Sequence, residues 1–289
     1  PGLIVDTDTL QPKENNYLMA LVPDEEDRWG IGIIDITTGE FRVTQVESLE
    51  SVRSELASVN PREVLLPEGA AGEGLRQLLA TSLQDRMVNT LPDWALAGDR
   101  AQKLILQFFA SGSLDSFGCA DLPGAIRAAG AILTYLEETQ KGALDHIRAL
   151  TTYHTRDYMV LDDATRRNLE LTATLQGGRK GSLLGVLDRT MTAMGGRLLR
   201  QWIHHPLVDV ERIRRRQQAV AELVEQSLPR NDLRGALDGV YDLERLNGKI
   251  AMGNANAKDL VALCGSLGRL PVLIDGLTGL ESPFLSDLC

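Results

Sequence analysis

Hydrophobic and polar positions alternate differently in the two parts of the chain. Short apolar runs at residues 17–22, 30–37 and 41–46 predict three strands, with a turn at Thr38-Gly39 before the last of them. Helical spacing at 49–59 follows, behind Ser48 as an N-cap, and then a strand at 63–66, a short helix at 74–79, a strand at 86–91 and a helix at 99–109. The order βββαβαβα predicts a mixed sheet with helices on its faces, an α/β fold.

After the small residues 111–113 the strand signals end, except for one short extended run at 158–161. Apolar positions at helical spacing predict helices at 125–140, 163–175, 183–187, 195–204, 209–226, 232–251 and 257–270. We therefore expect two domains, the mixed sheet in residues 1–110 and a mainly helical domain in residues 111–289. In the last helix the apolar face that includes Leu260 and Leu267 is expected to lie uncovered.

Composition and charge narrow the protein class. The chain is 43% hydrophobic and 24% charged, a composition that argues against a disordered protein. It has no run of about 18 consecutive apolar residues, which argues against a membrane protein. Three cysteines, far apart and odd in number, argue against a disulfide framework and a zinc site and favour the reducing cytoplasm. Of the net charge of −10, residues 1–110 carry −9, which makes the first part a poor surface for nucleic acid.

Asp35 is the candidate for metal chemistry, because the strand and turn of residues 32–39 (GIIDITTG) resemble the opening of ribonuclease H-like nucleases. The predicted element order is that of the ribonuclease H-like fold, whose nucleases use an aspartate on the first strand to help hold divalent metal. Such a site needs several converging carboxylates, and the later strands offer only Glu63. A metal-dependent nuclease using Asp35 is therefore the alternative function, beside the interpretation of Asp35 as a turn residue with local hydrogen bonds.

Three further motifs have structural interpretations. Residues 177–182, GGRKGS, lack the Lys-Ser/Thr pair and the preceding strand of a P-loop, so they predict a solvated loop. His204 and His205 point about 100° apart on a helix and do not form a chelating pair. The arginine run at 212–216 is partly offset by glutamates and is interpreted as a solvated helix face, with an acidic partner or DNA as the alternative contact.

The helix predicted at 195–204 places its apolar residues on one side. Met194, Leu198 and Trp202 share this face and are expected to pack in the core. Arg197 and Arg200 are expected to lie elsewhere on the helix. We therefore predict a structural role for this segment.

Three long stretches of the second part resemble the core of the MutS family of bacterial DNA mismatch repair proteins. They are residues 159–171 (MVLDDATRRNLEL), 182–207 (SLLGVLDRTMTAMGGRLLRQWIHHPL) and 242–245 (DLER). In the first part, residues 16–18 (NYL), 35–39 (DITTG) and 60–61 (NP) resemble the family's connector domain, which has a ribonuclease H-like fold without the nuclease site. The resemblance covers essentially the whole chain and implies a fold of α/β plus all-α type.

The resemblance implies a coupling role rather than catalysis. Family members bind mismatched DNA, hydrolyse ATP with Mg²⁺ and form homodimers through domains that we do not find in this sequence. We therefore expect the chain to be a piece of a longer protein, without a catalytic, ATP-binding, DNA-binding, cofactor or metal site of its own. Its connector and core would link mismatch binding to ATP hydrolysis in the parent protein.

The connector of the family also docks the partner protein MutL. The matching segment here is residues 100–107, RAQKLILQ. The resemblance implies Gln102 and Lys103 as partner-binding residues. Relatives have a glutamine pair where this chain has Gln-Lys.

Overall fold

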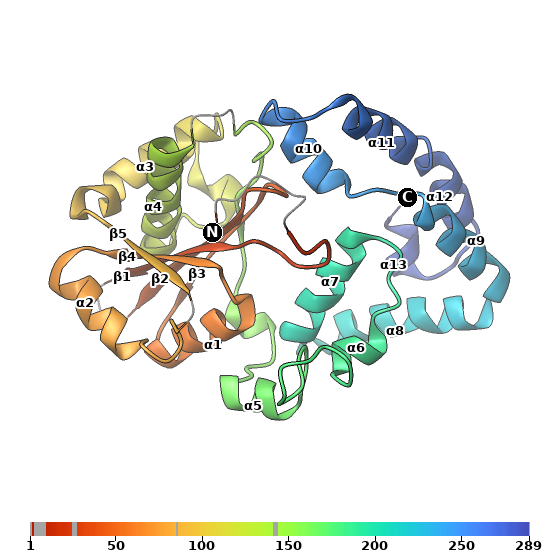
Figure 1. Ribbon diagram of the computed structural model, residues 1–289, viewed down its shortest axis with the longest axis horizontal. Coiled ribbons are helices and arrows are strands. Elements are labelled where there is room, and N and C mark those ends of the chain that lie inside the picture. Colours follow the sequence, from red (N-terminus) through yellow and green to blue (C-terminus); the bar gives the residue numbers. More distant parts are fainter. Residues whose placement is uncertain (1, 3–9, 25–27, 85, 141–143, 289) are drawn as a thin grey trace.

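The computed structural model describes residues 2, 10–24, 28–84, 86–140 and 144–288, which form a sheet region followed by a helical region (Figure 1). The sheet region contains β1 (Leu18–Pro23), β2 (Trp29–Asp35), β3 (Glu40–Val46), α1 (Leu49–Val59), β4 (Glu63–Pro67), α2 (Gly69–Leu78), β5 (Met87–Leu91), α3 (Gly98–Phe108), α4 (Pro123–Thr139) and β6 (Thr151–Thr152). The helical region contains α5 (Asp163–Asn168), α6 (Leu183–Leu187), α7 (Ala193–His204), α8 (Val210–Glu225), α9 (Ser227–Asp238), α10 (Leu243–Ala251), α11 (Ala257–Leu267), α12 (Leu270–Leu277) and α13 (Pro283–Ser286).

One mixed sheet holds the six strands, in the order β5-β4-β1-β2-β3-β6. β2 runs antiparallel to both β1 and β3, with Leu18 opposite Ile34 in the first of these pairs. β4 lies parallel to β1, β5 to β4, and β6 to β3. The predicted order βββαβαβα is confirmed, and β6 is an additional strand that no sequence pattern indicated.

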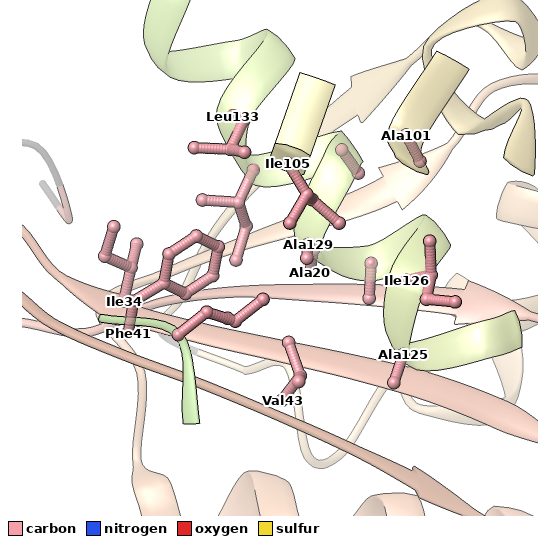
Figure 2. Packing of buried hydrophobic residues seen from close by; sticks show 14 of the residues in the cluster. Ala20, Ile34, Phe41, Val43, Ala101, Ile105, Ala125, Ile126, Ala129 and Leu133 are labelled. Atoms are coloured by element: carbon pink, nitrogen blue, oxygen red, sulfur yellow. The ribbon is translucent and has the colours of Figure 1, made fainter. Parts of the chain in front are cut away.

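Helices cover both faces of the sheet, which explains why β1 and β2 are apolar on both sides. On one face, Met19 and Ile31 belong to the core that α1 and α2 close with residues such as Leu56. On the other face, α3 and α4 cover the sheet (Figure 1). Figure 2 shows this second core, in which Phe41 of β3 lies under Leu133 of α4.

Helix α4 packs on the sheet, whereas the sequence interpretation assigned residues 125–140 to the helical domain. Small residues allow the close approach: a Cβ at Gly30 of β2 would lie 1.8 Å from the carbonyl oxygen of Gly124, and a Cβ at Gly130 would lie 2.3 Å from the Cβ of Ala101 in α3. With β6, α4 extends the sheet region to Thr152, well beyond the expected boundary at residue 110. An amphipathic pattern shows that a helix has a buried side but not what covers it.

Two helices of the second part differ from their predicted lengths. The helix expected at 163–175 ends at Asn168, because Glu170 takes a left-handed conformation with φ of 48°. The helix expected at 232–251 is divided into α9 and α10. Asp242 begins the second of these, because its side chain accepts a hydrogen bond from the backbone N–H of Arg245.

An apolar surface runs along α11 and α12 and lies uncovered, as expected. Leu260 and Leu267 are 52% and 48% exposed. By length and composition, Ala257–Leu277 could cross a membrane. In its most apolar stretch of 18 residues, 6% is buried within the protein. A single helix of this kind is a weak indication of a membrane segment, since it also carries four charged residues and Pro271.

Candidate functional site

The two residues assigned by resemblance, Gln102 and Lys103, lie exposed on α3. The other side of the helix is buried, because Ala101 and Ile105 pack into the core shared with α4. A shallow hollow beside Lys103 is lined by other α3 residues and by Glu137 of α4. Both assigned side chains are thus accessible on a helix whose position is set by the core.

An exposed tryptophan lies next to this surface. Trp94 is 50% exposed, and the guanidinium of Arg100 stacks 4.8 Å from the centre of its ring. Tryptophan and arginine are enriched among the residues that contribute most to protein–protein binding. The sequence interpretation missed Trp94, because it lies in a short turn between β5 and α3 where no periodic pattern marks it.

Asp35, the candidate metal ligand, is fully buried at the end of β2. Its Oδ1 accepts hydrogen bonds from the backbone N–H and the hydroxyl of Thr37, at 3.0 and 2.7 Å. Its Oδ2 accepts from the Asn15 amide and the Asn16 backbone N–H, both at 3.0 Å. The two contacts with Thr37 are the local contacts of the turn-residue interpretation, whereas Asn15 and Asn16 lie 20 and 19 residues earlier in the chain. The part of the chain that the structure describes holds no group of three or more His, Cys, Asp or Glu side chains placed to bind a metal ion.

The other motifs also lie in structural surroundings. In the 177–182 loop, Ser182 caps α6 by accepting a hydrogen bond from the backbone N–H of Gly185 at 3.1 Å. In the arginine run on α8, Arg214 pairs with Glu211 at 3.0 Å, and Arg216 stacks on the Trp202 ring at 3.6 Å. These contacts agree with a capped loop and a solvated helix face.

Arg197 forms the most buried ion-pair cluster between the helices, with a side chain 4% exposed. Its guanidinium donates to both carboxylate oxygens of Asp242, at 2.6 and 2.7 Å, and to Glu244 at 2.6 Å. Burial acts to lower the pKa of Arg197, but the two carboxylates raise it above its ordinary value, so the group stays charged. The expected arrangement of α7 is wrong here, because Leu198 is 47% exposed while Arg197 is buried.

The sheet region and the helical region meet along a polar seam between α1 and the ends of α5 and α7. The Ser58 hydroxyl lies 2.8 Å from Nε2 of His205, and the Ser54 hydroxyl donates to the Leu161 carbonyl at 3.0 Å. Arg166 donates to the His204 carbonyl at 2.7 Å. We call the contacts of Ser54 and Ser58 the α1 seam; the Arg166 contact lies within the helical region and holds α5 on the end of α7. The two histidines therefore face different neighbours.

A buried cation lies on the sheet side of the α1 seam. The Arg42 guanidinium lies over the rings of Tyr17 and Tyr153, 5.7 and 5.4 Å from their centres. Tyr153 donates to Glu55 of α1 at 2.6 Å. Burial raises the pKa of Glu55, although the hydrogen bond from Tyr153 and the charge of Arg42 lower it in part. Buried polar groups with these partners give the seam a defined geometry.

Acidification is expected to destabilise the fold through His204 and His205. Burial, together with the charge of Arg166, lowers the pKa of His204 to about 3 and that of His205 to about 4. In the unfolded chain the imidazole pKa is about 6.5. Between that pH and the lowered pKa of the folded state, the unfolded state therefore binds more protons than the folded state. The free energy of unfolding therefore falls as the pH falls from about 6.5 to about 4, by up to about 1.4 kcal/mol per pH unit for each ring.

Urea unfolding at about pH 7, 6 and 5 measures this slope. His205→Gln is expected to reduce the loss of stability on acidification, whereas His154→Gln, at an exposed position, is the matched control. The same slope for His205→Gln and the unmodified chain would contradict the prediction.

Two family models match the chain, one on each side of the change from sheet to helices, and residues 149–163 lie between the two matches. The model "MutS domain II" matches residues 16–148, and "MutS domain III" matches residues 164–288. The first match includes α4, in agreement with its position on the sheet.

Curated relatives match over the whole chain. The "DNA mismatch repair protein MutS" of Halothermothrix orenii is 42% identical over 293 residues, which cover 100% of this chain and 32% of the relative. The proteins of the same name from Symbiobacterium thermophilum and Nostoc punctiforme are each 43% identical and cover 100% of this chain and 33% of their own length. The chain thus spans about a third of the length of these relatives. It belongs to the MutS family of DNA mismatch repair proteins, with domain II as its sheet region and domain III as its helical region.

Proposed function

We propose that the chain is the connector and the first part of the core of a longer MutS protein. In that protein it would couple the binding of mismatched DNA to ATP binding and hydrolysis and would offer a docking surface to MutL. Duplex DNA, ATP with Mg²⁺ and the homodimer contact would be handled by other parts of the parent protein in the cytoplasm. These 289 residues would then transmit and dock rather than catalyse.

The coupling role is supported by the way in which the two regions are joined. A link conveys a change of state only if its parts move as rigid bodies with discrete contacts between them. The sheet region has a packed core on each face of its sheet, and its α1 seam to the helical region is made of directional hydrogen bonds such as Ser58 to His205. Directional contacts of this kind favour a small number of relative orientations.

The docking role is supported by the exposed surface of α3. Gln102 and Lys103 lie there, close in sequence to the stacked pair Trp94 and Arg100. A rigid helix surface with an accessible aromatic ring and flexible polar groups around it is typical of a protein-binding site. This surface is the observation that carries the MutL assignment.

Gln102→Ala is expected to weaken MutL binding about tenfold, because one central polar contact typically contributes about 1.4 kcal/mol. Trp94→Ala is expected to weaken it at least as much. Titration of the chain with MutL by calorimetry or biolayer interferometry would measure both. Arg214→Ala, on exposed α8, is the control with unchanged affinity. Wild-type affinity of both Gln102→Ala and Trp94→Ala would remove α3 from the docking surface.

We further propose that the uncovered apolar side of α11 and α12 is covered by other segments of the longer protein. Exposed residues along it include Val261 and Val272, 72% and 56% exposed. Contiguous apolar surface of this kind marks a contact with protein, and the relatives are about three times as long as this chain.

A further inference from the structure

Residues 11–16, which precede β1, lie between the sheet region and the helical region, and we call this segment the strap. Figure 1 shows this part of the chain, in red, reaching α7 before it returns to the sheet. The strap contains no helix or strand. It is nevertheless held by side chains from both regions.

From the helical side, cations hold the strap mainly by its main chain. Arg245 of α10 donates to the carbonyls of Gln11 and Glu14, at 3.1 and 2.6 Å. Arg197 of α7 donates to the carbonyl of Pro12 at 2.9 Å. The side chains of the two arginines are 6% and 4% exposed, so these charge-assisted hydrogen bonds are shielded from water.

The strap also contributes charged side chains to the helical region. Lys13 donates to Asp188 and to the Thr190 carbonyl, at 3.1 and 3.0 Å. Its aliphatic stem lies on the backbone of α7, since a Cβ at Gly196 would be 2.5 Å from it. Glu14 accepts from Arg200 at 2.7 Å.

From the sheet side, the buried carboxylate of Asp35 holds the end of the strap, and Glu40 also accepts from the Asn15 amide at 3.4 Å. Oδ2 of Asp35 accepts from the Asn15 amide and from the Asn16 backbone N–H, both at 3.0 Å. Glu14 in addition pairs with Arg62, next to β4, at 3.3 Å. Asp35, which resembles a nuclease aspartate in position, thus serves as the anchor of the strap on the sheet.

We propose that the strap is a latch that sets the angle between the sheet region and the helical region. With Arg197, Arg245 and Lys13 on the strap, the described residues join the two regions at the strap, at the α1 seam and at α10. There Gly248 lies against the Thr37 carbonyl and Met252 packs on the core of the sheet region. When the strap is released, Arg245 no longer ties α10 to the segment that leads into the sheet. The α1 seam then remains as a hinge, and the sheet region can rotate about it away from α10.

The contacts of the latch depend on where the main chain of the strap lies more than on which side chains the strap carries. On the strap, the two arginines bind only main-chain carbonyls, those of Gln11, Pro12 and Glu14, which lie close together along the chain. A displacement of the segment along its length therefore breaks the contacts of Arg197 and Arg245 together rather than one at a time. Such a concerted release is what a two-state switch requires.

The test measures the distance between the two regions in the whole chain. Spin labels at Glu73→Cys on α2 and Val224→Cys on α8, both exposed, are combined with serine at Cys264 and Cys289. Double electron–electron resonance is expected to give one narrow distance distribution for the latched protein. Arg245→Ala is expected to add a second, broader population, and hydrogen exchange of residues 11–16 is expected to rise about tenfold.

Two further variants make the result decisive. Lys13→Ala removes a latch contact from a side chain that is 33% exposed, so the variant is expected to fold and to broaden the distribution in the same direction. Arg234→Ala is the control, because its guanidinium donates to the Arg189 carbonyl inside the helical region. A single narrow wild-type distribution for both Arg245→Ala and Lys13→Ala would overturn the proposal; if Arg245→Ala does not fold by circular dichroism, Lys13→Ala alone decides it.

Discussion

Replacing Arg197 with methionine is expected to lower the free energy of unfolding of the helical region by about 3 kcal/mol. Methionine keeps most of the aliphatic stem but removes the charge that Asp242 and Glu244 share, at 2.6 to 2.7 Å. Asp242 is 18% exposed, so its carboxylate would remain partly buried without its cation. Removing one partner of a buried ion pair costs more than the pair itself contributes, because the remaining charge is left desolvated.

Urea unfolding followed by circular dichroism would measure the loss. Arg214→Met provides the matched control, since Arg214 is 63% exposed and pairs with a glutamate on the surface of α8. Its expected effect is below about 0.5 kcal/mol. If the two substitutions had similar effects, the Arg197 cluster would not be the structural centre of the helical region.

Gly30→Ala is expected to destabilise the sheet region by more than about 3 kcal/mol or to displace α4. The new Cβ would lie 1.8 Å from the carbonyl oxygen and 2.1 Å from the carbonyl carbon of Gly124. Both are backbone atoms, so no side chain can turn away to relieve the clash. Either β2 or α4 would have to shift, and the core between them would open.

The control is Gly74→Ala in α2, where the new Cβ meets no heavy atom within 4 Å outside its chain neighbours and the adjacent backbone of its own helix. Alanine is favoured over glycine inside a helix, so this variant is expected to be as stable as the unmodified chain or slightly more stable, by up to about 1 kcal/mol. Thermal unfolding followed by near- and far-ultraviolet circular dichroism compares the two. An unfolding midpoint for Gly30→Ala equal to that of Gly74→Ala would mean that α4 does not contact β2 as described.

The sheet could be predicted from the sequence because its strands have strong local patterns. The apolar runs in β1 and β2, the turn at Thr38-Gly39 and the Ser48 cap all depend on neighbouring residues. The position of α4 could not be predicted in this way. Its small residues face β2 and α3 across more than twenty intervening residues, and a pattern within one helix carries no information about that partner.

The same distinction between local patterns and contacts with residues distant in sequence applies to the candidate sites. The exposure of Gln102 and Lys103 agrees with the apolar spacing of α3, in which Ala101 and Ile105 are buried. The latch could not be predicted, because Arg197 and Arg245 bind backbone carbonyls of residues far away in sequence. From a helical pattern, an arginine is polar and is expected to face solvent. Here the two arginines are buried, and carboxylates and backbone carbonyls accept the hydrogen bonds that water would otherwise accept.

The late position of α4 has a consequence for the nascent chain. β3 ends at Val46 and α4 begins at Pro123, so the hairpins leave the ribosome well before the helix that covers one of their faces. At translation rates of roughly 5–20 residues per second, this face of the hairpins stays exposed for about 4 to 15 s before α4 is synthesised. During that time apolar side chains such as Ile34 and Phe41 are open to chaperones and to other nascent chains. Translation speed between these two elements would therefore influence how much of the protein reaches its native state.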